Sequence, residues 1–446
     1  MRVISKGAPA VLLLAGAAGA FILLAKDGTR PRRIVLVSVD ALRPDFLGVY
    51  NASAKCSPNI DRFAQESLVF LDAVSQAPST APSHKSILYS LYPSVHKVDT
   101  QSQPAELVTS PIEALRRNGY LTAAFTGGGQ MRKRLGFDRG FDLYWEPERR
   151  VERTEKLREM RPLVLKWLDQ HRKQSFFLFV HTYQVHCPYE PPQELFQECC
   201  TWYSGPIDPA GKCQSFYNST PMTPEDYRFL RDLYCAELRF VDAFFGELLD
   251  RFRKLGIYED SLIALFSDHG ESLGERGYVG HNQLDQVQLR IPLIIRVPGL
   301  AGRRVDSPVE AIDLMPTVFE ATGLVPPYRF QGRSLLKAGG PGSGDSEIVR
   351  ITETHDAVAL QGGPWKAVFP LARNRAPSLY RLAQDPEETS DVAATHPEVL
   401  ARFWAYYSSM HEVSRELSSK FVLQGGAQAP IDDKLREELK ALGYVN

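Results

Sequence analysis

Apolar runs that are rich in β-branched side chains predict a series of buried strands along the chain. The clearest is IVLVSV at 34–39, and similar runs lie at 120–126, 175–181, 262–267 and 292–297. Between them, apolar positions recur at helical spacing and predict helices at 58–66, 83–91, 111–117, 152–171, 224–255 and 310–322. Strands that alternate with helices indicate an α/β fold, in which helices cover both faces of a sheet.

The composition changes at 339–346, where GGPGSGDS predicts a linker. Beyond it, the pattern predicts a small α+β unit with strands at 347–352 and 365–369 and helices at 397–417 and 431–442. We therefore expect three parts, at 1–30, 31–338 and 347–446.

An uncharged apolar run, APAVLLLAGAAGAFILLA, covers residues 8–25. Basic residues flank it, with Arg2 and Lys6 before it and Lys26 directly after it. Such a run is typical of an export signal or a membrane anchor rather than of a core helix. We expect a single transmembrane helix that tethers the body outside the cytoplasm, in the periplasm or at the cell surface. Cleavage at a small-residue stretch such as AAGA would instead give a secreted protein.

The overall charge of the chain argues against nucleic acid as a partner. The 446 residues include 52 Lys and Arg against 53 Asp and Glu, which leaves a formal net charge of −1. Nucleic-acid-binding proteins usually carry a basic surface. Hydrophobic residues make up 43% of the chain, enough for a large core.

Six cysteines fit no zinc-binding spacing. For an exported protein, a disulfide between Cys213 and either Cys199 or Cys200 is plausible. For Cys187 and Cys235, free buried thiols are nearly as plausible as disulfides.

Acidic residues follow two of the predicted buried strands. Asp40 comes directly after the strand at 34–39, and Asp268 and His269 come directly after the strand at 262–267. Ligands of open α/β sheets bind at the carboxyl ends of the strands. Carboxylates suit Mg²⁺, Ca²⁺ and Mn²⁺, and the imidazole admits Mn²⁺ or Zn²⁺. The pattern predicts one divalent metal ion, although either aspartate alone is also typical of a turn or helix cap.

A hydroxyl group lies just before the predicted helix at 83–91, in the segment STAPSHKS that begins at Ser79. Backbone N–H groups and the helix dipole favour an oxyanion there. Thr80 is therefore a candidate nucleophile whose hydroxyl group the metal would acidify. An ordinary N-cap role explains Ser79 or Thr80 as well, and the local sequence alone favours that simpler interpretation.

A series of stretches resembles, in order, the motifs of the sulfatase family within the alkaline-phosphatase superfamily. They are VSVDALRPDFLGVY (37–50), SPNIDRFAQES (57–67), STAPSHKSILYSLYPSVH (79–96), GFDRGFDLY (136–144), FFLFVHTYQVHCPYEPP (176–192), SDHGESLGERGYVGH (267–281), RIPLIIRVPG (290–299), VEAIDLMPTV (309–318) and LYRLAQDPEET (379–389). Together they extend over nearly everything after residue 33. The resemblance implies a central mixed β-sheet flanked by helices, a catalytic domain at 31–338 and a small C-terminal subdomain.

The resemblance also implies roles for individual residues. Asp40, Asp268 and His269 correspond to metal ligands. Thr80 occupies the position of the nucleophile and would also touch the metal.

Further residues match positions near the transferred group. His186 and His281 correspond to residues that contact this group or the leaving group, although a structural role explains either one. His84 stands where the family signature has arginine. Lys85 beside it either supplies positive charge or is a solvated helix residue. His96 and His181 are expected to be structural.

Departures from the sulfatase signature favour phosphate over sulfate. Sulfatases oxidise a Cys or Ser to formylglycine, whereas oxidation of Thr80 would give a ketone because its β-carbon carries a methyl group. A plain threonine has no second hydroxyl with which to expel sulfate, but water or an alcohol can attack a phosphothreonine at phosphorus. Ala41 replaces the second Asp of the usual pair, and FTGGG at 125–129 stands near the place of the usual Gly-Lys-Trp-His segment.

We therefore predict a metal-dependent ester hydrolase that acts on phosphate, and less readily on sulfate, through a covalent Thr80 intermediate. Two alternatives stay open: a phosphoglycerol- or phosphoethanolamine-type transferase with a glycan or lipid acceptor, and a non-catalytic anion-binding protein. The expected partners are a small-molecule, glycan or lipid ester and, through the N-terminal segment, a membrane. No further Asp/His pair clearly completes a two-zinc site. The stretch at 193–222, with Trp202 and Tyr203, is either a lid or a surface loop.

Overall fold

The computed structural model describes residues 30–98, 109–148, 153–208, 218–219, 221–339, 348–372 and 375–421. The predicted anchor at 8–25 and the predicted helix at 431–442 lie outside these residues, as does most of the predicted linker. Across the described ranges, no helix combines the length and apolar character needed to span a membrane.

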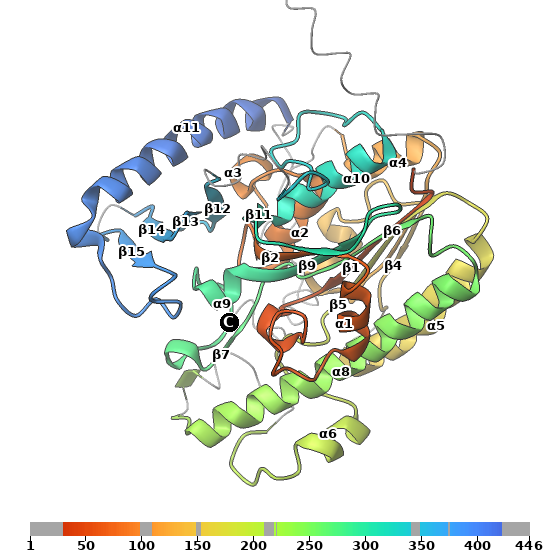
Figure 1. The fold of residues 1–446 in the computed structure, drawn as a ribbon, viewed down its shortest axis with the longest axis horizontal. Helices are drawn as coiled ribbons and strands as arrows, with labels where there is room; N and C mark the ends of the chain where they lie inside the picture. The colour runs from red at the N-terminus through yellow and green to blue at the C-terminus, as the bar shows by residue number, and fades with distance from the viewer. Residues whose placement is uncertain are drawn as a thin grey trace, which may run out of the picture.

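In the described part of the chain, a nine-stranded mixed sheet forms the centre of the molecule (Figure 1). The strand order is β10–β2–β9–β6–β1–β5–β3–β4, with β11 paired to β2. The bounds are β1 Arg33–Val39, β2 Leu68–Val74, β3 Leu121–Phe125, β4 Leu143–Trp145, β5 Phe176–Thr182, β6 Ser261–Phe266, β9 Arg290–Arg296, β10 Arg303–Val305 and β11 Val309–Glu310. Strand β9 runs antiparallel to β2 and β6, whereas β1 is parallel to both β5 and β6. The predicted α/β fold with a mixed sheet is confirmed.

Helices cover both faces of this sheet (Figure 1). Side chains of a strand point alternately to opposite faces, so Val35, Val37 and Val39 join one hydrophobic cluster while Ile34 and Leu36 join the other. The first cluster includes residues of α1 Pro58–Ala64, α5 Arg153–His171 and α8 Pro224–Lys254. The second includes residues of α2 Thr80–Tyr89, α4 Pro111–Arg117 and α10 Leu314–Thr322. Burial on both faces explains why the strands read as continuous apolar runs.

A second, antiparallel sheet follows near the C-terminus. It consists of β12 Arg350–Glu353, β13 Ala357–Gly362, β14 Trp365–Pro370 and β15 Ser378–Arg381. Helix α11 Pro397–Phe421 contributes Val399, Phe403 and Tyr407 to the hydrophobic cluster of this sheet. The α+β character of the C-terminal part therefore agrees with the prediction.

Two predicted helices differ from those observed. The helix predicted at 83–91 begins earlier, at Thr80, because the N–H groups of a first helical turn have no intrahelical partner and Pro82 therefore fits there. The helix predicted at 310–322 is divided into strand β11, a 3₁₀ turn at Ala311–Asp313 and α10. The remaining short elements are α3 Pro93–His96, α6 Gln193–Cys199, β7 Ser272–Leu273, β8 Val279–Gly280 and α9 Gln286–Leu289.

The cysteines pair differently from the prediction. Cys56 forms a disulfide with Cys235 of α8, and Cys187 is also disulfide-bonded. Cys199 and Cys200 are free, so the predicted bridge from either of them is wrong, as is a free thiol at Cys187 or Cys235. Cys56 and Cys235 are 179 residues apart in sequence, and only the packing of α8 beside the loop before α1 brings them together.

Candidate active site

The carboxyl ends of three neighbouring strands form the floor of the site. In the sheet register, Ser38 of β1 lies opposite His181 of β5 and Phe266 of β6. Asp40 and Asp268 therefore leave the sheet at the same edge, as predicted. The side chains of both aspartates are completely buried.

Three candidate metal ligands converge at this edge. The Nε2 atom of His269 lies 3.6 Å from Asp40 Oδ1 and 3.5 Å from Asp268 Oδ2. The other ring nitrogen, Nδ1, lies 2.9 Å from the carbonyl oxygen of Gly270. A carbonyl oxygen only accepts hydrogen bonds, so Nδ1 carries the proton and Nε2 of the neutral ring presents a lone pair to two carboxylates.

The arrangement of these ligands fits a divalent cation. His269 Nε2 and Asp268 Oδ2 are buried and have no hydrogen-bond partner. Ligand atoms of Asp40, Asp268 and His269 all lie within 4.8 Å of one another. Buried acceptors that face one another are costly unless a positive charge lies between them, and a cation with oxygen and nitrogen ligands provides it.

The electrostatics of the site agree with this assignment. Burial, followed by repulsion from Asp40, raises the pKa of Asp268 to about 7. Burial lowers the pKa of the His269 imidazole to about 4. At neutral pH the imidazole is therefore in its neutral form, which is the form that binds metal ions.

A histidine that the sequence analysis took as structural holds Asp40. The backbone N–H of Gly127 points to Nδ1 of His181 at 3.4 Å, which makes Nδ1 the acceptor. The proton therefore resides on Nε2, which donates to Asp40 Oδ2 at 3.2 Å. Its position opposite Ser38, near the carboxyl end of β5, is the signal that could have identified it.

His84 has the equivalent position beside the second aspartate. Its Nδ1 donates to the carbonyl oxygen of Thr80 at 2.9 Å and lies 3.3 Å from Asp268 Oδ2. Its Nε2 accepts from the Ser38 hydroxyl group at 2.8 Å. Burial lowers its pKa to about 4, so at neutral pH His84 does not supply the positive charge of the arginine it replaces.

Thr80 is the first residue of α2 and points into the site. Its hydroxyl group donates to Asp40 Oδ2 at 3.0 Å. The N-cap residue is Ser79, whose side chain makes no capping hydrogen bond. Thr80 is therefore not the N-cap, and its hydroxyl group adjoins the candidate metal ligands.

Lys85 contacts aromatic rings instead of the site carboxylates. Its Nζ atom lies 4.2 Å from the ring centroid of Tyr89 and 5.2 Å from that of Phe137. The side chain is buried, so the alternative of a solvated helix residue is wrong. The contacts are those of a cation–π arrangement.

His186 and His281 lie together beside the metal ligands. Their Nε2 atoms are 3.0 Å apart, and the ring centroid of His281 is 4.5 Å from that of His269. The Nδ1 atom of His281 donates to the carbonyl oxygen of Pro78, two residues before Thr80. Glu271, which the sequence analysis did not single out, has a ligand atom within 4.8 Å of both rings.

Gln130 is another residue that sequence reasoning missed. It follows the FTGGG segment, and its Oε1 atom accepts from the backbone N–H of Ala81 at 2.8 Å, directly after Thr80. Its Nε2 group is buried without a hydrogen-bond partner. A neutral amide donor thus adjoins the helix start.

The inserted stretch at 193–222 packs in two directions. The indole of Trp202 donates to Asp232 at 2.9 Å, and Tyr203 stacks on Phe229, so both aromatic residues lie against α8. Asn218 exchanges two hydrogen bonds with the backbone of Val279, two residues before His281. The lid hypothesis therefore has support from Asn218 and none from the two aromatic residues.

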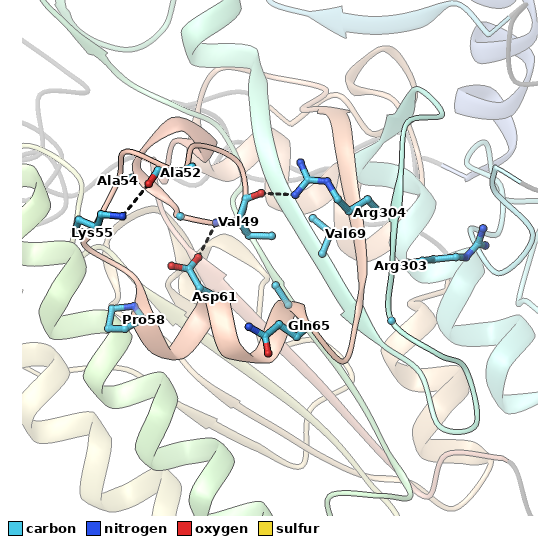
Figure 2. A pocket seen from close by; sticks show the side chains of 13 residues that line it. Val49, Ala52, Ala54, Lys55, Pro58, Asp61, Gln65, Val69, Arg303 and Arg304 are labelled. Atoms are coloured by element: carbon cyan, nitrogen blue, oxygen red, sulfur yellow. Dashed lines mark hydrogen bonds between the residues drawn. The ribbon is translucent and has the colours of Figure 1, made fainter.

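A surface groove lies at the other end of the sheet (Figure 2). Val69 and Arg303, near the amino ends of β2 and β10, line it. Arg304 donates to the Val49 carbonyl at 2.7 Å and Asp61 accepts from the Val49 N–H at 2.8 Å. These contacts hold the groove together, and none of its lining residues belongs to the site at the carboxyl ends.

Comparisons with known proteins place this geometry in a family. The sulfatase family model matches residues 32–324. A sulfatase from Formosa agariphila is 25% identical over 401 residues, which cover 76% of this chain and 78% of that protein. A choline-sulfatase from Rhizobium meliloti is 26% identical over 426 residues, covering 81% and 82%. The structure of a phosphonate monoester hydrolase from Agrobacterium radiobacter superimposes with a TM-score of 0.72 at 22% identity, covering 87% of this chain and 96% of that one. The chain therefore belongs to the sulfatase family.

Proposed function

We propose that this sulfatase-family enzyme hydrolyses phosphate esters through a covalent intermediate on Thr80. The observation that carries the proposal is the Thr80 hydroxyl group, 3.0 Å from Asp40 Oδ2 and at the start of a ten-residue helix. Asp40 also adjoins His269, so the nucleophile and the candidate metal ligands share one carboxylate.

The residues suited to hold the metal are Asp40, Asp268 and His269, together with the Thr80 hydroxyl oxygen. When bound there, a divalent ion would lower the pKa of the hydroxyl group and offset charge on the reacting oxygens. Asp40 Oδ2 accepts the Thr80 proton, and His181 fixes the orientation of that carboxylate. The positive end of the α2 dipole favours negative charge nearby, although the Ala81 N–H already donates to Gln130 and Pro82 has no N–H group.

The reaction has two steps. The Thr80 oxygen attacks phosphorus, so that a bond between Oγ1 and phosphorus forms while the bond to the leaving oxygen breaks. A proton shared between the Nε2 atoms of His186 and His281 passes to the leaving oxygen. Water then attacks phosphorus and gives a proton back to the His186–His281 pair. The bond to Oγ1 breaks, and the proton held by Asp40 returns to Thr80 as inorganic phosphate is released.

The identity of the nucleophile favours phosphate. Threonine carries one hydroxyl group, so a sulfated Thr80 would have no second hydroxyl with which to expel sulfate. A phosphorylated Thr80 is released by attack at phosphorus.

Activity assays on Thr80 variants test the proposal. Aryl phosphate monoesters, phosphate diesters and sulfate esters would be offered to the purified protein with Mn²⁺, Zn²⁺, Mg²⁺ or Ca²⁺. We expect phosphate ester cleavage, a loss on the order of 10³-fold or more in Thr80→Ala, and partial activity in the matched variant Thr80→Ser. Intact mass spectrometry with phosphorus analysis would detect a phosphoryl group on Thr80 after brief exposure to substrate.

The same assay separates the alternatives. Release of phosphate in water without an acceptor supports a hydrolase, whereas turnover only with an added alcohol or glycan acceptor supports a transferase. Saturable binding of phosphate without turnover would support the anion-binding alternative. Full activity in Thr80→Ala would overturn the proposal.

A further inference from the structure

A second group of potential metal ligands adjoins the first. His186 follows β5, Glu271 precedes β7, and His281 follows β8. All three side chains are buried, and a ligand atom from each lies within 4.8 Å of the other two.

The proton positions on the two imidazoles favour a cation between them. Nδ1 of His186 donates to the Cys187 carbonyl oxygen at 2.6 Å, and Nδ1 of His281 donates to the Pro78 carbonyl oxygen at 3.0 Å. Both protons are therefore on Nδ1, and the neutral rings face each other through Nε2 lone pairs only 3.0 Å apart. Two such lone pairs repel unless a proton or a metal ion lies between them.

The side chain of Glu271 favours a metal ion over a proton between the two histidines. The Oε2 atom of Glu271 accepts from the Tyr189 hydroxyl group at 2.6 Å and from the backbone N–H of Cys187 at 3.3 Å. The segment that carries His186 thus also orients the carboxylate. Two imidazole ligands and one carboxylate are a ligand set typical of zinc, and backbone carbonyls that fix Nδ1 are the usual support for histidine ligands.

We propose that His186, Glu271 and His281 bind a second divalent cation, Zn²⁺ or Mn²⁺. The rings of His269 and His281 are 4.5 Å apart, so the two sites adjoin. The inference rests on the proposed function and changes one part of it: a cation bound by His186 and His281, in place of a proton shared between them, would offset the charge of the leaving oxygen. Paired ions act in this way on the two oxygens of an in-line displacement. The second site was not evident from the sequence because its three residues lie on separate segments that only the fold brings together.

Metal stoichiometry tests this proposal independently of activity. The full chain would be stripped with a chelator, dialysed against Zn²⁺ or Mn²⁺, and analysed for metal content and by calorimetric titration. We expect two ions per chain in the unaltered protein and one in Glu271→Gln and in His281→Ala. Glu271→Gln is the stronger variant because its amide oxygen can still accept from Tyr189, so the fold should be kept. The matched control is His355→Ala, which replaces an exposed histidine far along the chain from His281. This variant should keep two ions.

The outcomes are decisive for each idea separately. One ion per chain in the unaltered protein, or two ions retained in both Glu271→Gln and His281→Ala, would overturn the second site. If either result is found while Thr80→Ala still abolishes turnover, the proposed function stands without the second metal site. If two ions bind but Thr80→Ala remains active, the second site stands and the proposed function fails.

Discussion

Two buried histidines adjoin the carboxylates of the candidate metal site. His181 donates to Asp40, whereas His84 donates its Nδ1 proton to the Thr80 carbonyl oxygen and lies 3.3 Å from Asp268 Oδ2. Both rings are completely buried, and burial lowers the pKa of each to about 4. At neutral pH both rings are therefore neutral, and His181 orients the Asp40 carboxylate without changing the charge of the site.

Replacing His181 tests this positioning role. We expect His181→Ala to weaken divalent-ion binding by roughly 10–100-fold, the usual effect of losing a hydrogen bond to a metal ligand. His181→Gln, whose amide can donate to Asp40, should recover part of the affinity. Calorimetric titration with Mn²⁺ or Zn²⁺ would measure both.

The control for cavity formation is His96, another buried histidine. It contacts Ser86 and the backbone of Pro82 and Val98, and none of these residues is a candidate metal ligand. We expect His96→Ala to lower stability while the folded protein keeps its metal affinity. Equal losses of affinity in His181→Ala and His96→Ala would refute a specific role for His181.

The glycine after His269 is required by a close backbone approach. Its N–H donates to the Gln288 carbonyl at 2.8 Å, and its own carbonyl oxygen accepts from His269. A β-carbon on Gly270 would collide with the carbonyl oxygen of Val287, a backbone atom that cannot rotate away. We expect Gly270→Ala to cost about 1–3 kcal/mol of unfolding free energy and to weaken metal binding.

Chemical denaturation and metal titration of Gly270→Ala would check this expectation. Gly246→Ala is the comparison, because the three atoms nearest to an added β-carbon there belong to the side chain of Asn59. That variant should lose stability without a change in metal affinity. Unaltered metal binding in Gly270→Ala would show that His269 does not depend on this contact.

At the level of elements, the strands that end at the site were predictable and strand β2 was not. Strands β1, β5 and β6 are buried on both faces, which gives continuous apolar runs. Strand β2 was missed because its register shifts between Phe70 and Ala73 and because the run is interrupted by Asp72, which pairs with Arg350. The polar partner of Asp72 comes from the C-terminal sheet and cannot be inferred from the local pattern.

The same distinction applies to the site residues. The convergence of Asp40, Asp268 and His269 was predictable because they lie just beyond the carboxyl ends of two buried strands, whereas their role as metal ligands stays a prediction. The contacts of His181 and His84 depend on strand register and on side-chain direction, which no spacing in the sequence reveals.

The disulfide between Cys56 and Cys235 ties the loop before α1 to α8. It closes a segment of 179 residues, and long closed loops restrict the unfolded chain most. We expect the double variant Cys56→Ser/Cys235→Ser to lose about 2–5 kcal/mol of unfolding free energy, measured in urea. Cys199→Ser, which removes a free thiol, should change stability little. A double variant as stable as Cys199→Ser would contradict this role.

At the scale of the whole molecule, the C-terminal sheet supports the segment that carries the nucleophile. Thr352 of β12 donates to the Ser75 carbonyl oxygen at 2.6 Å. The Ser75 hydroxyl group hydrogen-bonds to Ser83 of α2, which in turn donates to the Asp268 carbonyl oxygen. A continuous set of hydrogen bonds therefore joins the two sheets through the start of α2.

A buried carboxylate at this junction makes the stability of the molecule depend on pH. Glu310 accepts from the Ile351 N–H at 2.9 Å and from the Tyr92 hydroxyl group at 2.9 Å. Burial, followed by repulsion from Asp313, raises its pKa from 4.5 to about 8, despite the opposing effect of Arg350. Between these two values the folded protein binds more protons than the unfolded chain, so the stabilisation present below the lower value is lost as the pH rises through the upper one.

Replacing Glu310 by Gln should remove this part of the pH dependence. Glutamine cannot ionise, and its amide oxygen can still accept from Ile351. We expect the unfolding free energy of the unaltered protein to fall between about pH 5 and about pH 8, and that of Glu310→Gln to fall by less. Urea unfolding at both pH values measures the difference, with the exposed Glu387→Gln as a control that should follow the unaltered protein. Identical pH dependence in Glu310→Gln and Glu387→Gln would mean that the junction between the sheets does not titrate in this range.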